Sequence, residues 1–270
     1  MQLCKAQKND LPLLKQMWVD IFKDSNKFAE FAVNICDTEE IYLVRENDRI
    51  ASMVVAGINL TAYGKKGFYI YGLCTQPEFE GRGYATKLMN YVCEEKFSKG
   101  YEFAVAQPAQ ESLFDYYRKL GFENTTYLRK GQITVPKNLW ATAAFDTVTA
   151  GRFKEIRSRY SEDEIVHFTS KGYEKFAEYI YSEGGSTAES DGAYCLYFEN
   201  EENVIVRDLF AKSTQHALKL LQAVRERTGK EVFELQISQN SQLFLGEGKL
   251  VPHCVIKNLD KEVYANLMFD

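Results

Sequence analysis

A glycine-bearing turn between an apolar run and an amphipathic segment constrains the fold more than any other feature of this sequence. The run from Gly67 to Thr75 is apolar on both faces, which is typical of a strand buried between two layers. After the turn at 77–83, apolar residues recur at helical spacing and predict a helix over 84–97. The glycines allow several N–H groups to point into one concavity at the start of that helix, which suits a phosphate or pyrophosphate. A purely structural strand-to-helix turn is the alternative.

The rest of the chain alternates predicted strands and helices. In the first half we expect helices within 10–33, hairpin strands at 40–46 and 49–59, a strand at 101–106, a helix at 111–119 and a strand pair after Gly121. In the second half we expect helices at 151–160 and 166–182, a mobile polar loop at 183–192, hairpin strands at 193–199 and 203–210, a helix at 214–228 and a strand at 231–237. This alternation predicts an α/β fold with a mixed sheet and helices on its faces.

The two halves resemble each other around their central helices. The helical segment from Ala85 aligns with the segment from Ala217, and the core-facing positions of the two coincide. The strand Tyr69-Ile-Tyr-Gly-Leu aligns with Ile205-Val-Arg-Asp-Leu, whereas the turn at 212–215 is shorter and has no glycine. We therefore expect an internal repeat of one α/β unit, with domains at 1–139 and 140–270. An unrelated α+β domain in the second half is the alternative.

Composition excludes several classes of protein. The 270 residues suffice for two domains, and the net charge of −5 gives no support to binding of nucleic acid or an anionic membrane. Six cysteines and three histidines are scattered singly, so we expect free thiols and no metal site. No stretch has the ~20 apolar residues of a membrane span, and the N-terminus has no signal-like apolar stretch. We expect a cytoplasmic protein whose oligomeric state the sequence leaves open.

Two motifs in order resemble the GNAT acetyltransferase superfamily. Glu80-Gly-Arg-Gly83-Tyr-Ala85 matches the family's Gln/Arg-x-x-Gly-x-Gly/Ala phosphate loop, with Pro77 ahead of it. Tyr117-Arg-Lys-Leu-Gly121-Phe122 matches the Tyr-x-x-x-Gly-Phe signature that follows one helix and one strand later. The resemblance covers about 1–135 and is nearest to Eis-like bacterial members with an additional C-terminal domain. It implies two tandem GNAT-like acyltransferase domains, the second a degenerate and non-catalytic copy.

The resemblance also implies the residues that hold acetyl-CoA as co-substrate. The phosphate loop would supply Glu80, Gly81, Arg82, Gly83, Tyr84 and Ala85. The pantetheine arm would pair along Leu73, Cys74 and Thr75 as an added strand, and a main-chain N–H there would stabilise the oxyanion. Glu80 departs from the family, because a carboxylate near a pyrophosphate is repelled unless it points away or is paired, with Arg82 as the candidate partner.

Tyr117 is the catalytic residue that the resemblance implies, as the acid that protonates the departing CoA thiolate. Tyr116 is the alternative if the helix register differs by one, and a half-buried structural tyrosine is the other. No general base stands out: Glu39, Glu40 and Glu111 are acidic candidates, and a role as solvated surface residues is favoured for each. In Eis-like enzymes the C-terminal carboxylate reaches the active site, so the tail 264–270 is a further candidate.

The function expected from these residues is transfer of an acetyl group from acetyl-CoA to a primary amine. The acceptor is a small-molecule or peptide amine that the sequence does not specify. One alternative is an acyl-CoA-binding or regulatory protein without turnover, which Glu80 and the missing base favour. Another is a protein-interaction module whose glycine turn is only structural.

Overall fold

A computed structural model describes residues 1–160, 164–266 and 269. By its internal contacts the chain divides into two units, and each is built from two separate segments. Unit 1 consists of Met1–Thr125 and Cys254–Lys261, and unit 2 of Thr126–His253 and Glu262–Asp270. The domain boundaries expected from the sequence, at 1–139 and 140–270, stay a prediction.

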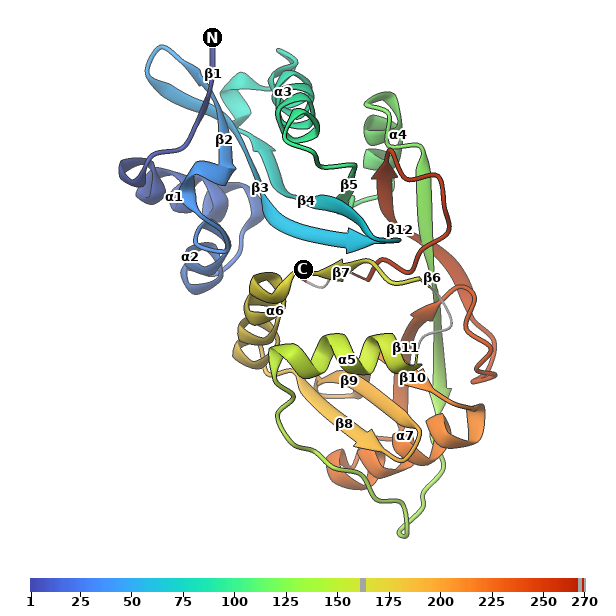
Figure 1. The fold of residues 1–270 in the computed structure, drawn as a ribbon. Coiled ribbons are helices and arrows are strands. Elements are labelled where there is room, and N and C mark those ends of the chain that lie inside the picture. The colour runs from blue at the N-terminus through green and yellow to red at the C-terminus, as the bar shows by residue number, and fades with distance from the viewer. Residues whose placement is uncertain (161–163, 267–268, 270) are drawn as a thin grey trace. The chain divides into compact units, whose positions relative to one another are not determined.

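Unit 1 has a mixed sheet with helices on both faces (Figure 1). Its elements are β1 (Gln2–Lys5), η1 (Lys8–Asp10), α1 (Leu11–Phe22), α2 (Asn26–Val33), η2 (Thr38–Glu40), β2 (Ile41–Glu46), β3 (Arg49–Ala62), β4 (Lys65–Thr75), η3 (Pro77–Phe79), α3 (Tyr84–Ser98), β5 (Phe103–Ala106) and α4 (Ser112–Lys119). The strand order is β1-β2-β3-β4-β5, followed by the end of β12 (Lys249–Lys257). The sequence therefore predicted the α/β class, the long helix 84–97 and the hairpin 40–59 correctly.

Local chemistry explains several of these boundaries. Asn47 and Asp48 both have positive φ (49° and 62°), so the turn between β2 and β3 has the conformation that favours tight hairpins. Pro12 lies in the first turn of α1, where its missing N–H costs no helical hydrogen bond. Ser25 caps α2 by accepting a hydrogen bond from the Phe28 N–H at 3.1 Å. Each signal is short-range, which is why the sequence located these elements.

The last strand of unit 1 comes from the far end of the sequence. Residues 255–257 of β12 pair antiparallel with residues 104–106 of β5, and Val255 is buried in the unit 1 core. The prediction of a strand pair after Gly121 is wrong, because the stretch between Gly121 and the next helix forms a single strand, β6 (Asn124–Thr134). Residues 128–134 of β6 pair antiparallel with 232–238 of β11 in unit 2. Each unit therefore uses a strand from the other half of the sequence.

Unit 2 repeats the mixed architecture with its own core. It holds most of β6, α5 (Ala150–Tyr160), β7 (His167–Phe168), α6 (Ser170–Ser182), β8 (Ser186–Ser190), β9 (Ala193–Glu199), β10 (Asn203–Ala211), α7 (Thr214–Thr228), β11 (Val232–Ser238) and the start of β12. The strand order in its sheet is β6-β11-β10-β9-β8. As β4 pairs parallel with β5 across α3, β10 pairs parallel with β11 across α7, so the expected repeat of the strand–helix–strand unit is confirmed.

The polar segment 183–192 contains a strand, so the mobile loop expected there is wrong. Ser186–Ser190 forms β8 and pairs antiparallel with β9, from Ser186 opposite Tyr197 to Ser190 opposite Ala193. Thr187 and Ala188 are buried, and Thr187 donates a hydrogen bond from its hydroxyl to the Asp146 carbonyl at 2.9 Å. Pairing with the apolar strand β9 therefore orders β8, although the polar composition of β8 alone does not predict a strand.

Candidate active site

The candidate site begins where β4 extends beyond β5. The two strands pair in parallel from Gly67 opposite Phe103 to Ile70 opposite Ala106, where β5 ends. β4 continues to Thr75, and among the described residues this stretch pairs with β3 alone. An extended ligand can therefore add to this side of β4 as a strand would.

A bulge in β4 sets which groups face the open edge. Opposite β3, Val55 pairs with Tyr71 and Met53 with Cys74, so β4 has one extra residue between them. Beyond the bulge, the Gln76 N–H donates to the Ala51 carbonyl at 2.9 Å. Because alternate residues of a strand turn their main-chain groups to opposite sides, Thr75 turns its N–H away from β3 and toward the open edge.

The buried hydroxyl of Ser52 holds residues 74 and 75 of β4 in place through two hydrogen bonds. Ser52 on β3 has no exposed surface, and its hydroxyl donates to the Cys74 carbonyl at 2.7 Å and accepts from the Thr75 hydroxyl at 3.0 Å. The Cys74 side chain is buried, and burial raises the pKa of its thiol. Leu73 lies in the bulge with its side chain against the core beneath α3. The side chains of Leu73 and Cys74 are therefore turned into the protein, and the main chain of Thr75 is suited to meet a ligand along this edge.

The predicted phosphate loop forms an open cradle at the start of α3. Gly81 and Gly83 have φ of 73° and 72°, and Gly83 is the N-cap residue of α3. A Cβ built on either glycine would meet no atom within 4 Å, so the space above both is free. Tyr84 and Ala85 begin the helix, whose first N–H groups lack partners within the helix. Amides, helix dipole and free space together fit an anionic group.

Glu46 at the end of β2 holds this loop in place. Its carboxylate accepts hydrogen bonds from Arg82 at 2.8 Å and from the Tyr84 hydroxyl at 2.7 Å. Two guanidinium groups lie over the Phe79 ring, with centroid distances of 5.1 Å for Arg49 and 5.2 Å for Arg82. Arg82 is thus paired with Glu46 and not with Glu80, the partner expected from the sequence. Glu80 is exposed, so its charge is screened by solvent.

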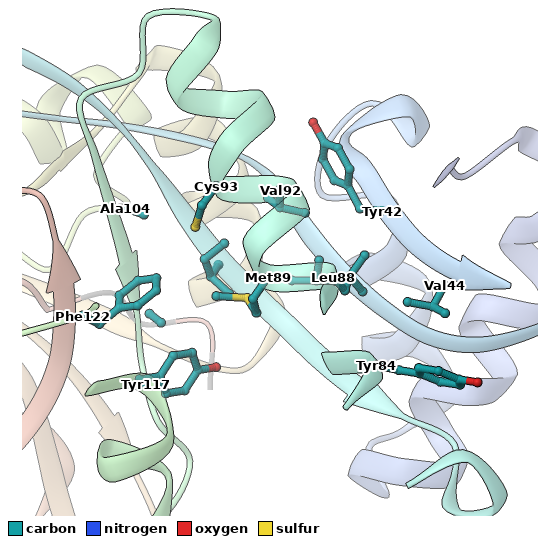
Figure 2. Close-up of a cluster of buried hydrophobic side chains, with 14 of the residues drawn as sticks. Tyr42, Val44, Tyr84, Leu88, Met89, Val92, Cys93, Ala104, Tyr117 and Phe122 are labelled. Atoms are coloured by element: carbon teal, nitrogen blue, oxygen red, sulfur yellow. The ribbon is translucent and has the colours of Figure 1, made fainter. Parts of the chain in front are cut away.

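Tyr117 lies in the hydrophobic cluster beneath α3, where it packs against Phe122 at a ring distance of 5.5 Å (Figure 2). In Figure 2 its hydroxyl points away from Phe122. The side chain is 6% exposed, and burial, helped by the neighbouring Tyr116, raises the pKa of the phenol. Tyr116 packs on Tyr117 at 5.3 Å, and burial raises its pKa as well. Both tyrosines therefore keep their protons at neutral pH.

The candidate bases lie in different settings. Glu40 forms an ion pair with Lys96, whose side chain is 1% exposed, so its carboxylate already has a structural partner. Glu39 and Glu111 are exposed. The tail candidate, the carboxylate of Asp270, lies outside the described residues, although Tyr264, Asn266 and Phe269 are described and buried in unit 2.

Trp18 is the residue near the bulge that the sequence analysis did not assign to the site. Gly72 lies at the bulge with a φ of 61°, and a Cβ there would clash with the six-membered ring of Trp18. The Trp18 N–H donates to Asp24 at 2.8 Å. Trp18, Glu46 and Ser52 lie 22 to 54 residues before their partners, and such long-range contacts leave no periodic signal in the sequence.

The described part of the chain holds neither a candidate metal centre nor a candidate membrane-spanning helix. Over residues 1–160, 164–266 and 269, no group of three or more His, Cys, Asp or Glu side chains could hold a metal ion. In the same part of the chain, no helix is both long and apolar enough to cross a membrane.

The splayed β4–β5 pair, the bulge and the glycine cradle before α3 are the arrangement of the GNAT class of acyltransferases. Residues 2–125 match the family model described as an acetyltransferase (GNAT) domain, and this segment is therefore a GNAT domain. No curated protein matches the sequence.

Solved structures extend the likeness to nearly the whole chain. A GCN5-related N-acetyltransferase from Anabaena variabilis has a TM-score of 0.74 and 15% identity, with 94% of this chain and 72% of that chain covered. Eis1 from Mycobacterium abscessus has a TM-score of 0.70 and 11% identity, with 95% of this chain and 73% of that chain covered. A tandem GNAT protein from the clavulanic acid biosynthesis pathway has a TM-score of 0.59 and 12% identity, with 94% of this chain and 97% of that chain covered. At these identities the likeness establishes the fold alone.

Proposed function

We propose that this protein transfers the acetyl group of acetyl-CoA to a primary amine, with the reaction carried out in unit 1. The observation that carries the proposal is the open cradle at Gly81 and Gly83 beside the unpaired edge of β4. The cradle fits a pyrophosphate, and the edge fits the amides of a pantetheine arm. Similar solved structures described as N-acetyltransferases support the same chemistry.

Acetyl-CoA supplies an activated thioester, and the chain's own residues supply binding, charge stabilisation and a proton. The acceptor nitrogen forms a bond to the acyl carbon, and the carbon–sulfur bond then breaks. A main-chain N–H in 73–75 stabilises the oxyanion in between, and the Thr75 N–H faces the right side of the strand. The nitrogen loses its proton to solvent or to a base, and CoA leaves as a thiolate.

Tyr117 is the proposed proton donor to that thiolate. Its raised pKa keeps the phenol protonated. The same burial that raises the pKa of the phenol raises the proton affinity of a thiolate formed beside it, so the two remain matched. Tyr116, whose ring lies against Tyr117, is the alternative donor.

Calorimetry with acetyl-CoA tests the proposal, on the wild type and on Gly83→Trp. The space at the Cβ position of Gly83 is open, so the Trp side chain should project into the cradle and compete with the ligand. We expect micromolar binding that Gly83→Trp abolishes, while Gly83→Ala, with the same backbone strain and little bulk, retains most of it. An amine screen follows, with Tyr117→Phe as the control for turnover. Absence of binding to the wild type would overturn the proposal.

A second candidate function is an acyl-CoA-binding protein without turnover. The exposed carboxylate of Glu80 beside the cradle and the engagement of Glu40 with Lys96 favour it. This candidate predicts wild-type binding of acetyl-CoA together with no acetylation of any amine in the screen.

A further inference from the structure

The two faces of β4 have different surroundings at the bulge. Phe68 and Ile70 face the cluster under α3, whereas Tyr71 faces the other side and contacts Trp18 of α1 at a ring distance of 5.2 Å. Gly72 also faces Trp18, since its Cβ would collide with that ring. Two successive residues therefore face the α1 side, as a bulge permits.

The Trp18 ring is held rigidly on that face. Its N–H donates to Asp24 at 2.8 Å, and it contacts Phe22 at 4.6 Å and Phe28 at 6.3 Å. The side chain is 2% exposed, so little space remains around it. Because the hydrogen bond fixes one edge of the indole and the aromatic neighbours fix its faces, the six-membered ring stays over the main chain of Gly72.

The geometry of the cradle determines which end of the ligand meets this ring. The pyrophosphate would sit at the N-terminus of α3, on the opposite face of β4 from α1. A pantetheine arm that starts on the α3 face and runs along the open edge delivers its acyl end to the bulge and toward the α1 face. The Trp18 ring fills the α1 side of the bulge, so a long acyl chain could extend there only by displacing that ring.

We propose that Trp18 is a specificity-determining residue that limits the acyl group to a short chain such as acetyl or propionyl. The inference rests on the proposed function, since it names which acyl-CoA the same site accepts. Trp18 acts by steric exclusion, so it discriminates between acyl chains without contributing to the binding of the CoA moiety. No proton or bond is transferred to or from its side chain.

The test compares the dissociation constants of CoA, acetyl-CoA and hexanoyl-CoA for three proteins. In the wild type we expect hexanoyl-CoA to bind at least about tenfold more weakly than acetyl-CoA. Trp18→Ala should remove that difference while leaving the affinity for CoA itself unchanged, because CoA has no acyl chain. Trp18→Phe keeps an aromatic ring against Phe22 and Phe28 but is too short to cover Gly72, and it serves if the alanine variant does not fold.

Trp140→Ala is the matched tryptophan control, since Trp140 is 91% exposed and lies in unit 2. It should retain wild-type selectivity. In a Trp140→Phe background Trp18 is the remaining tryptophan, and acetyl-CoA should change its fluorescence more than CoA does.

The possible outcomes distinguish failure of the proposed function from failure of the inference about Trp18. If the wild type binds none of the three ligands, the proposed function fails and the inference fails with it. If the wild type binds CoA but does not discriminate by chain length, only the inference is overturned. It is also overturned if a folded Trp18 variant binds CoA normally and keeps the wild-type preference for acetyl-CoA.

Discussion

At the scale of single residues, the environment of Tyr117 determines over which pH range it can act as an acid. An exposed tyrosine titrates near pH 10, and burial raises the pKa of Tyr117 above that value. The protonated, active form therefore persists through and beyond pH 10, and loss of the acid would appear only at still higher pH.

We accordingly expect kcat to rise as the acceptor amine loses its proton and to show no fall below about pH 10. Tyr117→Phe should lower kcat by about 100-fold with little change in the KM for acetyl-CoA. Tyr116→Phe is the matched control and should stay within about threefold of the wild type. A pH–rate profile of all three proteins is the measurement. A larger loss in Tyr116→Phe than in Tyr117→Phe would assign the acid to the neighbouring residue.

Glu80 is the residue that opposes anion binding at the cradle. Since it is exposed and its neighbour Arg82 is paired with Glu46, its charge is neutralised by no side chain of the loop. Glu80→Gln should therefore strengthen CoA binding by about two- to fivefold at low salt, the magnitude of an exposed charge interaction. The gain should shrink as ionic strength rises from about 0.01 to 1 M. Calorimetry at both salt concentrations checks this, and equal affinities of the two proteins at low salt would contradict it.

At the scale of elements, the Glu40–Lys96 pair joins η2 to the last turns of α3. Burial lowers the pKa of Lys96, whose ammonium lies 4.8 Å from the Tyr101 ring and within reach of Glu40. Glu40→Gln should destabilise the fold by about 2–3 kcal/mol, somewhat less than for a fully buried pair because Glu40 is partly exposed.

The double variant Glu40→Gln/Lys96→Met tests whether the loss comes from the stranded charge. It should be more stable than Glu40→Gln alone, since no unpaired ammonium remains buried. Urea unfolding of the single and double variants measures the difference. If Glu40 were instead the general base, Glu40→Gln would lower kcat strongly while leaving the free energy of unfolding unchanged.

Elements with short-range signals were predictable from the sequence, and elements defined by distant partners were not. α3 and the glycine loop carry their own periodicity and turn chemistry, so both were located correctly. β8 is polar and becomes a strand only because β9 lies beside it. The clamp by Glu46 was missed for the same reason, because a carboxylate 36 residues before Arg82 has no pattern that links the two.

At the scale of the whole molecule, the repeat explains why the second unit is a poor candidate for catalysis. The sequence aligns Gly72 with Asp208, and β10 has a register shift between Val206 and Asp208 as β4 has near Gly72. In unit 2 this position carries a fully buried carboxylate beside the fully buried Arg157, with 3.2 Å between Nε and Oδ2. Tyr264 donates to the same carboxylate at 3.0 Å. A charged network therefore occupies the place that the bulge glycine and Trp18 occupy in unit 1.

The exchange of strands between the two halves makes unit 1 dependent on the end of the sequence. Without β12, the edge of β5 is unpaired and the space filled by Val255 is empty. Asn124 also loses the carbonyls of Leu259 and Lys261, each 2.9 Å from its amide nitrogen. A fragment of residues 1–139 should therefore aggregate or unfold without cooperativity, although it contains every residue of the proposed site.

Fusing residues 252–261 to that fragment through a glycine–serine linker should restore the strand beside β5. We expect the fused protein to unfold cooperatively and to bind CoA, because register is set by the apolar residues that β12 turns to the core. A fused segment in which Val255 is replaced by Asp keeps the length but cannot be buried, so it should fail to rescue. Thermal unfolding of the three fragments decides the matter. If the fragment 1–139 alone melts cooperatively within about 5 °C of the full chain, then β12 is dispensable and the first half is an autonomous domain.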